Sequence, residues 1–211
     1  MIYFLTLFCH SERSEESVYI QVNLLVYVIR SFAMLRMTTW CEQIYHSLKQ
    51  FQNTMKPRGL RNNNPLNIRQ TRTQWQGMAK EQTDPEFVTF KSMAYGYRAA
   101  WRTLHTYFYR FVTEKKPFNV RNILHRWAPP TENDTEAYIR SIEKLTGIGE
   151  EEKLLSPIYL NVYHHMARLI AGMTVMENGI RMEEVDHEAI QEGYCLAFPD
   201  NREAVILGNV L

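Results

Sequence analysis

Apolar residues recur at helical spacing through the middle of the chain and predict a long core helix. The pattern starts directly after Ser92, whose side chain can cap a helix N-terminus, and continues to Phe111. The residues on this apolar face are Met93, Tyr97, Ala100, Trp101, Leu104, Tyr107, Phe108 and Phe111. A face with this many large side chains is expected to pack in the protein core.

Two helices are predicted to follow the long one. The first runs from Asn119 to Trp127 and stops before Pro129-Pro130, because proline cannot continue a helix. The second starts near Asn133, which has capping-box spacing to Glu136, and ends at Gly147.

The last third of the chain is predicted to add two more helices. Ser156-Pro157 is typical of a helix start, and the apolar pattern that follows it leads to Gly172. A shorter helix is predicted between Asp186 and Gly193. We expect this region to cover the core formed by the preceding helices.

The segment before the long helix has a different pattern. Pro57, Gly59 and Pro65 exclude a continuous helix over residues 55–73. Residues 75–90 read as short extended pieces that end in the alternation Phe-Val-Thr-Phe. The predicted fold class is therefore mostly α, with a small β hairpin near the start of the domain.

Composition indicates one globular domain without a charged tail. The chain has 211 residues, of which 45% are hydrophobic, and a formal net charge of +1. This balance argues against a nucleic-acid partner, although the basic residues of segment 55–73 could face phosphates, an anionic cell wall or solvent. Cys9, Cys41 and Cys195 are too far apart to predict a disulfide framework or a zinc site.

The pattern of the N-terminal region predicts neither a signal peptide nor a membrane span. The first apolar run lacks a basic start and a small-residue cleavage site. Polar residues interrupt the apolar stretch 18–35, so no uninterrupted span of about 18 residues remains.

Two short segments of this region look like the two arms of a translated inverted repeat. With suitable codons, the reverse complement of HSERSEES (residues 10–17) encodes RFFASLRM, which differs from RSFAMLRM (residues 30–37) only at Ser31 and Met34. The pair resembles dispersed bacterial intergenic repeats. We therefore predict that residues 1–54 are a spurious or disordered extension and that the domain comprises residues 55–211; a genuine N-terminal hairpin or helix is the alternative.

The sequence RGLRNNNPLNIR (residues 58–69) has two interpretations. Asparagine tolerates left-handed backbone conformations, so Asn62, Asn63, Asn64 and Asn67 suit a tight polar turn. The alternative is a binding site, which the order of the motifs favours. The asparagines are followed by Trp75-Gln-Gly, by the Phe-Val-Thr-Phe alternation, and later by WAPPTENDTEAY.

This succession resembles the lysozyme-like glucosaminidases of autolysins and flagellar cell-wall enzymes. It resembles still more closely a set of prophage-borne proteins described as virion structural or lysozyme-like. The likeness covers about residues 58–155 and leaves 156–211 as a helical C-terminal cover. It implies a lysozyme-like helical domain whose substrate is the glycan strand of peptidoglycan, with Asn63, Asn64, Asn67, Trp75 and Tyr138 as candidate substrate-binding residues. Core packing is the alternative role of Tyr138, and the favoured one for Trp127.

Cleavage of a glycosidic bond requires a carboxylic acid to protonate the leaving oxygen. In the glucosaminidases, the principal glutamate precedes the asparagine segment, and this chain has no clear counterpart there. Glu81 lies where the resemblance places a second carboxylate and is the candidate catalytic residue, whereas Asp84 beside Pro85 is better explained by a turn. No metal site or cofactor is predicted, because the histidines are not spaced as ligands.

The predicted function is cleavage of peptidoglycan glycan strands, of the glycosidase or lytic transglycosylase type. A non-catalytic virion structural or peptidoglycan-binding protein that has lost its acid is the alternative. Partners would be glycan strands and other phage or virion proteins. We expect the protein to stay cytoplasmic until lysis or to be carried in the virion.

Overall fold

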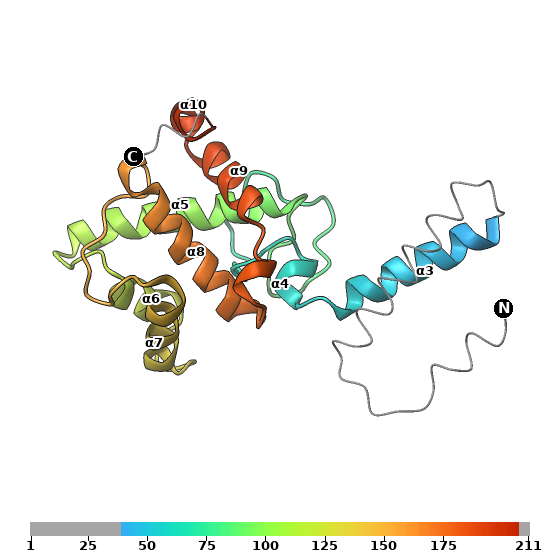
Figure 1. The fold of residues 1–211 in the computed structure, drawn as a ribbon, viewed down its shortest axis with the longest axis horizontal. Coiled ribbons are helices and arrows are strands. Elements are labelled where there is room, and N and C mark those ends of the chain that lie inside the picture. Colours follow the sequence, from blue (N-terminus) through green and yellow to red (C-terminus); the bar gives the residue numbers. More distant parts are fainter. Residues whose placement is uncertain (1–38, 207–211) are drawn as a thin grey trace. The chain divides into compact units, whose positions relative to one another are not determined.

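The computed structural model describes residues 39–206, and the chain divides into two units between Lys56 and Pro57. The described part of the first unit is helix α3 (Thr39–Met55) (Figure 1). None of the α3 side chains that the structure describes is buried. The two repeat-like segments at residues 10–17 and 30–37 lie outside the described residues, and the domain start near Met55 stays a prediction.

The second unit is helical, as the sequence predicts. Its α-helices are α4 (Arg58–Arg61), α5 (Met93–Thr113), α6 (Val120–Trp127), α7 (Thr135–Thr146), α8 (Tyr163–Asn178), α9 (His187–Ala197) and α10 (Arg202–Ile206). Three short 3-10 helices connect them, η1 (Leu160–Val162), η2 (Met182–Glu184) and η3 (Pro199–Asn201).

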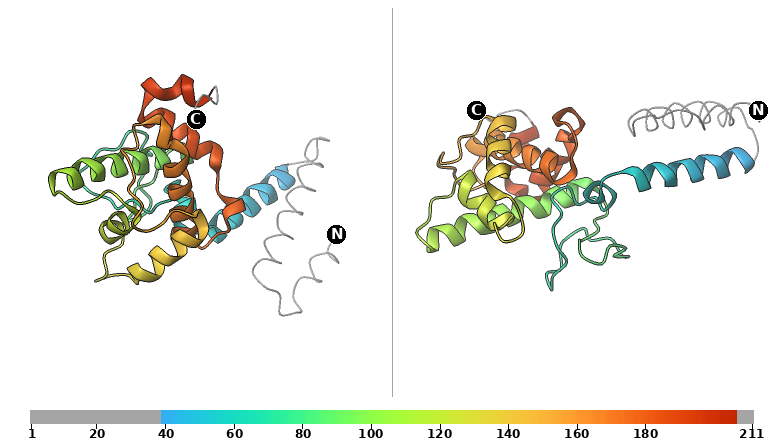
Figure 2. Two further views of the ribbon diagram at one scale, coloured as in Figure 1. Left: turned by 60° about the vertical axis from the view of Figure 1, so that its left-hand side comes forward. Right: turned by 90° about the horizontal axis from the view of Figure 1, so that it is seen from below.

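Helix α5 is the centre of this unit, and α9 packs against it over much of its length (Figures 1 and 2). Trp101 of α5 is fully buried, and its ring stacks on Tyr163 of α8 and meets the edge of Tyr194 of α9. Its indole Nε1 donates a hydrogen bond to the Ile190 carbonyl at 3.1 Å. Trp101, which the sequence pattern assigns to the core, therefore connects three helices.

A glycine allows α5 and α9 to approach closely. A Cβ atom on Gly193 of α9 would lie 2.7 Å from the Cβ of Tyr97 and 2.9 Å from the Ala94 carbonyl oxygen and the Arg98 nitrogen. Two of these three atoms belong to the backbone of α5, which cannot move away independently. Any larger residue at this position must push the two helices apart.

A smaller apolar cluster lies beside the main core. It consists of Ile68, Val88, Phe90 and Ala99, with Trp75, Met78, Tyr95 and Trp127 packed against it. Trp127 also contacts the main core, so this residue joins the segment that precedes α5 to the rest of the helices.

The predicted β hairpin does not form strands. Among the described residues, the region contains two isolated antiparallel bridges, Arg69 with Phe87 and Met78 with Phe90. Backbone hydrogen bonds still cross the region, such as those from the Gln70 N–H to the Glu86 carbonyl at 2.7 Å and from the Val88 N–H to the Ile68 carbonyl at 2.9 Å. Side chains, described below, add further hydrogen bonds between the same parts of the segment.

Four helix boundaries differ from the prediction. The helix predicted to end at Gly193 is α9, which continues to Ala197. Asp134, not Asn133, caps α7, since its carboxylate accepts the Ala137 N–H at 3.0 Å. Ser156-Pro157 precedes a turn rather than a helix, and α8 begins at Tyr163. Gly172 lies inside α8, where it faces Thr146 and Ile142 of α7, and the helix ends at Asn178. The predicted end of α7 at Gly147, with left-handed backbone, is confirmed.

Within residues 39–206, no helix combines the length and the apolar character that crossing a bilayer requires.

Candidate functional site

The buried side chain of Asn64 holds the segment 62–90 together. Its Nδ2 donates to the carbonyls of Ile68 (2.9 Å) and Val88 (2.8 Å), and its Oδ1 accepts the Ile68 N–H at 2.9 Å. The residue is fully buried, and these bonds occupy both ends of its amide. The predicted substrate-binding residue Asn64 therefore lies in the interior of the segment.

Asn63 and Asn67 adopt the left-handed backbone conformation that asparagine tolerates, with φ of 50° and 49°. The Asn63 Nδ2 donates to the Phe90 carbonyl at 3.0 Å, which joins the two ends of the segment. Asn67 instead points its Nδ2 at Glu177 of α8. Of the three asparagines predicted to bind substrate, Asn67 alone reaches a carboxylate.

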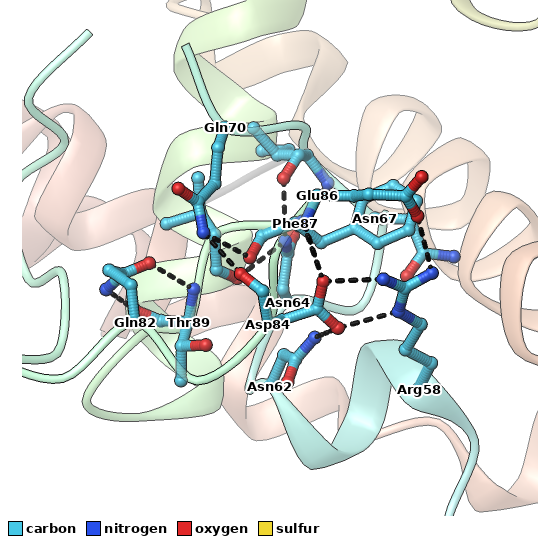
Figure 3. Close-up of polar contacts among 12 residues, drawn as sticks. Arg58, Asn62, Asn64, Asn67, Gln70, Gln82, Asp84, Glu86, Phe87 and Thr89 are labelled. Atoms are coloured by element: carbon cyan, nitrogen blue, oxygen red, sulfur yellow. Dashed lines mark hydrogen bonds and ion pairs between the residues drawn. The ribbon is translucent and has the colours of Figure 1, made fainter. Parts of the chain in front are cut away.

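Asp84 forms a second anchor of this segment (Figure 3). Its carboxylate accepts two hydrogen bonds from the Arg58 guanidinium (2.6 and 2.7 Å) and one from Asn62 Nδ2 at 2.9 Å. The backbone N–H groups of Glu86 and Phe87 donate to the same carboxylate. These donors, Arg58 above all, hold the pKa of Asp84 well below its usual range. The sequence interpretation of Asp84 as a turn former agrees with these contacts.

Glu81 and Trp75 lie away from any cluster of polar groups. Glu81 is exposed, and among the described residues it has no hydrogen bond or ion pair. Trp75 is half-buried against the smaller apolar cluster, and its Nε1 has no partner within the described part of the chain. The catalytic assignment of Glu81 stays a prediction that rests on resemblance alone.

The contacts of Glu177 bring together residues from four parts of the second unit. The Oε1 atom of Glu177 accepts hydrogen bonds from Trp127 Nε1 and from the Tyr138 hydroxyl, each at 3.1 Å. The Oε2 atom accepts one from Asn67 Nδ2, also at 3.1 Å. We call these four residues, Glu177, Asn67, Trp127 and Tyr138, the Glu177 cluster. It combines two of the predicted site residues with a carboxylate that sequence analysis did not select.

Glu177 lies at the C-terminal end of α8 and is held there by neutral donors. It lies in the last turn of α8, where the helix dipole disfavours negative charge. Among the described residues, no Lys, Arg or His forms an ion pair with it, and its donors are all neutral. Burial, together with the adjacent Glu177, raises the pKa of Tyr138 well above its usual value, so this hydroxyl remains a donor.

The carboxylate of Glu177 keeps capacity for one further partner. A carboxylate has about four lone-pair positions. Two on Oε1 and one on Oε2 are occupied by the three donors of the cluster. Glu177 is half-buried rather than enclosed. The open position on Oε2 can therefore accept a hydrogen bond from a bound molecule or carry a proton.

A single carboxyl group is available in this cluster. Within residues 39–206, no second Asp or Glu side chain is hydrogen-bonded to the Glu177 cluster, and no group of three potential metal ligands occurs. The cluster can act as a proton donor and acceptor or as a polar binding site.

A sequence signal for Glu177 exists but is indirect. Met166, Ile170 and Met173 are fully buried at helical spacing on α8, and Glu177 follows at the next position of the same stripe. A carboxylate at the end of a buried apolar stripe is uncommon and indicates a specific role. The predicted helix ends at Gly172 and therefore does not include Met173 and Glu177, so the sequence prediction misses this pattern.

Comparison with known proteins gives one informative relative. The chain is 39% identical over 140 residues to "Protein P5" of Pseudoalteromonas phage PM2, an alignment that spans 65% of this chain and 79% of the phage protein. No family model matches the chain. The lysozyme-like resemblance is thus not confirmed, whereas the relation to a phage protein is.

Proposed function

The chain belongs to the family of protein P5 of Pseudoalteromonas phage PM2, and from this premise we propose that it is a phage-derived protein that cleaves peptidoglycan glycan strands. The observation that carries the proposal is the Glu177 cluster. A half-buried carboxyl group is oriented there by three neutral donors and retains one open position. We assign the acid–base role to Glu177 in place of Glu81, because no neighbouring group positions Glu81.

A single carboxyl group favours lytic transglycosylation over hydrolysis with two carboxylates. In its protonated form, Glu177 donates its proton to the glycosidic oxygen as the bond from that oxygen to C1 breaks. This C1 belongs to a muramic acid residue of the strand. The C6 hydroxyl of that residue then bonds to C1 and returns a proton to Glu177. The products are a 1,6-anhydro sugar end and a free 4-hydroxyl, and no water is consumed.

The three donors have separate tasks in this scheme. Trp127 and Tyr138 fix Oε1, so that the proton is carried by Oε2. Asn67 fixes the orientation of Oε2 from the opposite chain segment. Such preorganisation is the usual way in which a protein keeps a catalytic group in reactive geometry.

A non-catalytic role in a phage particle is the second candidate. The observation that favours it is that the three donor groups of the cluster, Asn67 Nδ2, Trp127 Nε1 and the Tyr138 hydroxyl, already have a protein acceptor. In this case the protein would bind glycan strands, or other virion proteins, without turnover.

The test uses purified sacculi and compares the wild-type chain with Glu177→Gln and Glu81→Gln. We expect wild type and Glu81→Gln to release 1,6-anhydro ends at similar rates, measured by chromatography of the products. Glu177→Gln should be slower by about 10²- to 10⁴-fold, the usual contribution of a general acid. Its melting temperature should stay within a few degrees of the wild-type value, because the loss of one acceptor oxygen is offset by removal of a negative charge from a helix C-terminus.

The outcomes separate the assignments. A loss of activity in Glu81→Gln with full activity in Glu177→Gln would return the catalytic role to Glu81. Binding of glycan strands without release of any product by the wild type would favour the structural role. Release of ordinary reducing ends would indicate hydrolysis.

A further inference from the structure

Building on the proposed function, we propose that Arg69 binds a carboxylate of the glycan substrate and that Glu132 occupies this position in the free protein. The two side chains form an ion pair, Arg69 Nη2 to Glu132 Oε2, at 3.6 Å. The pair joins the two chain segments that supply the donors of the Glu177 cluster.

The positions of both residues follow from the chain. Arg69 is two residues after Asn67, which donates to Glu177, and the intervening Ile68 points into the smaller apolar cluster. Glu132 lies in the connection between Trp127 and Tyr138, the other two donors. A molecule that reaches Oε2 of Glu177 therefore approaches the region where Arg69 and Glu132 meet.

The ion pair is weak enough to be exchanged. The Arg69 and Glu132 side chains are 65% and 63% exposed, and their separation is longer than a good hydrogen bond. Exposed pairs of this kind contribute little to stability and are screened by salt. An anion on a substrate can replace Glu132 at small cost.

An aromatic ring limits the motion of Arg69. Its guanidinium lies 5.6 Å from the centre of the Phe87 ring, and Arg58 lies 4.5 Å from the same ring. Arg58 is already bound by Asp84 and Glu86, so it is not available to a ligand. Arg69 is therefore the positioned cation of this pair that can change its partner.

The substrate class supplies a matching anion. Every second sugar of a peptidoglycan glycan strand is a muramic acid residue, whose lactyl group ends in a carboxylate once the peptide is removed. Arginine binds carboxylates in a planar two-bond geometry that lysine cannot reproduce. A contact from Arg69 would select glycans that carry this acid over neutral ones.

The experiment measures binding by the full chain with Glu177→Gln in every protein, so that no product forms. The two ligands are peptide-free glycan strands with free lactyl carboxylates and the same strands after conversion of these carboxylates to amides. Titration calorimetry is done on the parent protein and after adding Arg69→Gln, Arg69→Lys, Glu132→Gln or the control Arg72→Gln. Arg72 is exposed and has no ion pair within residues 39–206, so its variant removes the same charge nearby.

We expect Arg69→Gln to weaken binding of the acidic strands about five- to tenfold and to leave binding of the amidated strands unchanged. Arg69→Lys should recover only part of this loss. Glu132→Gln should strengthen binding of the acidic strands about twofold, because it removes the competing carboxylate. Arg72→Gln should change the affinity for either ligand only by the small amount that the loss of one distant positive charge causes.

Two results would overturn the inference. Arg69→Gln that weakens both ligands equally would show a structural role, as would Glu132→Gln that weakens binding in parallel with Arg69→Gln. Failure of the proposed function is recognised separately, because the wild-type chain would then release no product from sacculi, whether or not it binds the strands.

Discussion

At the scale of single residues, most of the asparagines in the sequence RGLRNNNPLNIR have a structural role. Asn62, Asn63 and Asn64 direct their amide groups to Asp84 and to backbone carbonyls of the same segment. The prediction that asparagines suit a polar turn is met by these three residues. The alternative, a role in recognition, retains support at Asn67 through its contact with Glu177.

Asp84 provides a stability prediction with a defined pH dependence. Asp84→Asn removes a charged acceptor that binds Arg58, Asn62 and two backbone N–H groups. We expect its melting temperature at pH 7 to be about 5 °C below that of the wild type, measured by circular dichroism.

The difference between the two proteins should depend on pH in one direction. The pKa of Asp84 is lowered in the folded protein, so its contribution is complete above the ordinary aspartate pKa of about 3.9 and is lost as pH falls below it. The gap in melting temperature should therefore be constant from pH 6 to 8 and should narrow below about pH 4. A gap that widens in acid would show that Asp84 is not ionised in the native state.

At the scale of elements, the close contact between α5 and α9 contributes to the free energy of unfolding. Gly193→Ala adds one methyl group where α5 backbone atoms lie 2.9 Å from the new Cβ position. We expect a loss of about 2 kcal/mol in the free energy of unfolding, measured by urea denaturation, although alanine is the better helix former.

A neighbouring residue provides the control for this substitution. Glu192→Ala changes the adjacent, exposed position of α9 and should shift the urea midpoint only slightly. If Gly193→Ala were as stable as Glu192→Ala, the helices would have to be free to separate at this crossing.

Helix existence could be predicted from sequence better than helix limits. The apolar periodicity of 93–111 and the left-handed Gly147 correspond to α5 and to the end of α7. The predicted start of α8 is too early, because a proline at a suitable spacing also occurs in turns. The predicted end of α8 is also too early, because Gly172 allows close packing on α7 and does not end the helix.

At the scale of the whole molecule, the division between Lys56 and Pro57 makes the domain start testable. We propose that residues before Met55 contribute nothing to the fold of the second unit. A chain that begins at Met55 should therefore show the melting temperature of the full chain within about 1 °C, together with a single cooperative transition by calorimetry. A markedly lower melting temperature would show that the preceding residues belong to the domain.

The candidate site shows what a single sequence cannot predict. Asn67 and Glu177 are separated by 110 positions, and only the packing of α8 beside the asparagine segment brings them together. Asn67 and Tyr138 belong to short sequence motifs that carry the family resemblance. The carboxylate that they share comes from a region without a recognised motif, so its assignment required the tertiary structure.

The Asn64 side chain, which adds to the backbone hydrogen bond between Val88 and Ile68, has a consequence for where this protein can gain or lose residues. The Asn64 amide joins Ile68 to Val88 through their carbonyl groups and does not depend on the residues between them. Exposed positions such as 71–74 lie outside this connection, so inserted residues there would leave it intact. One residue added between Asn64 and Ile68 would break it. Length variation among relatives should therefore be concentrated in the outer part of the segment, while the spacing of its first asparagines stays constant.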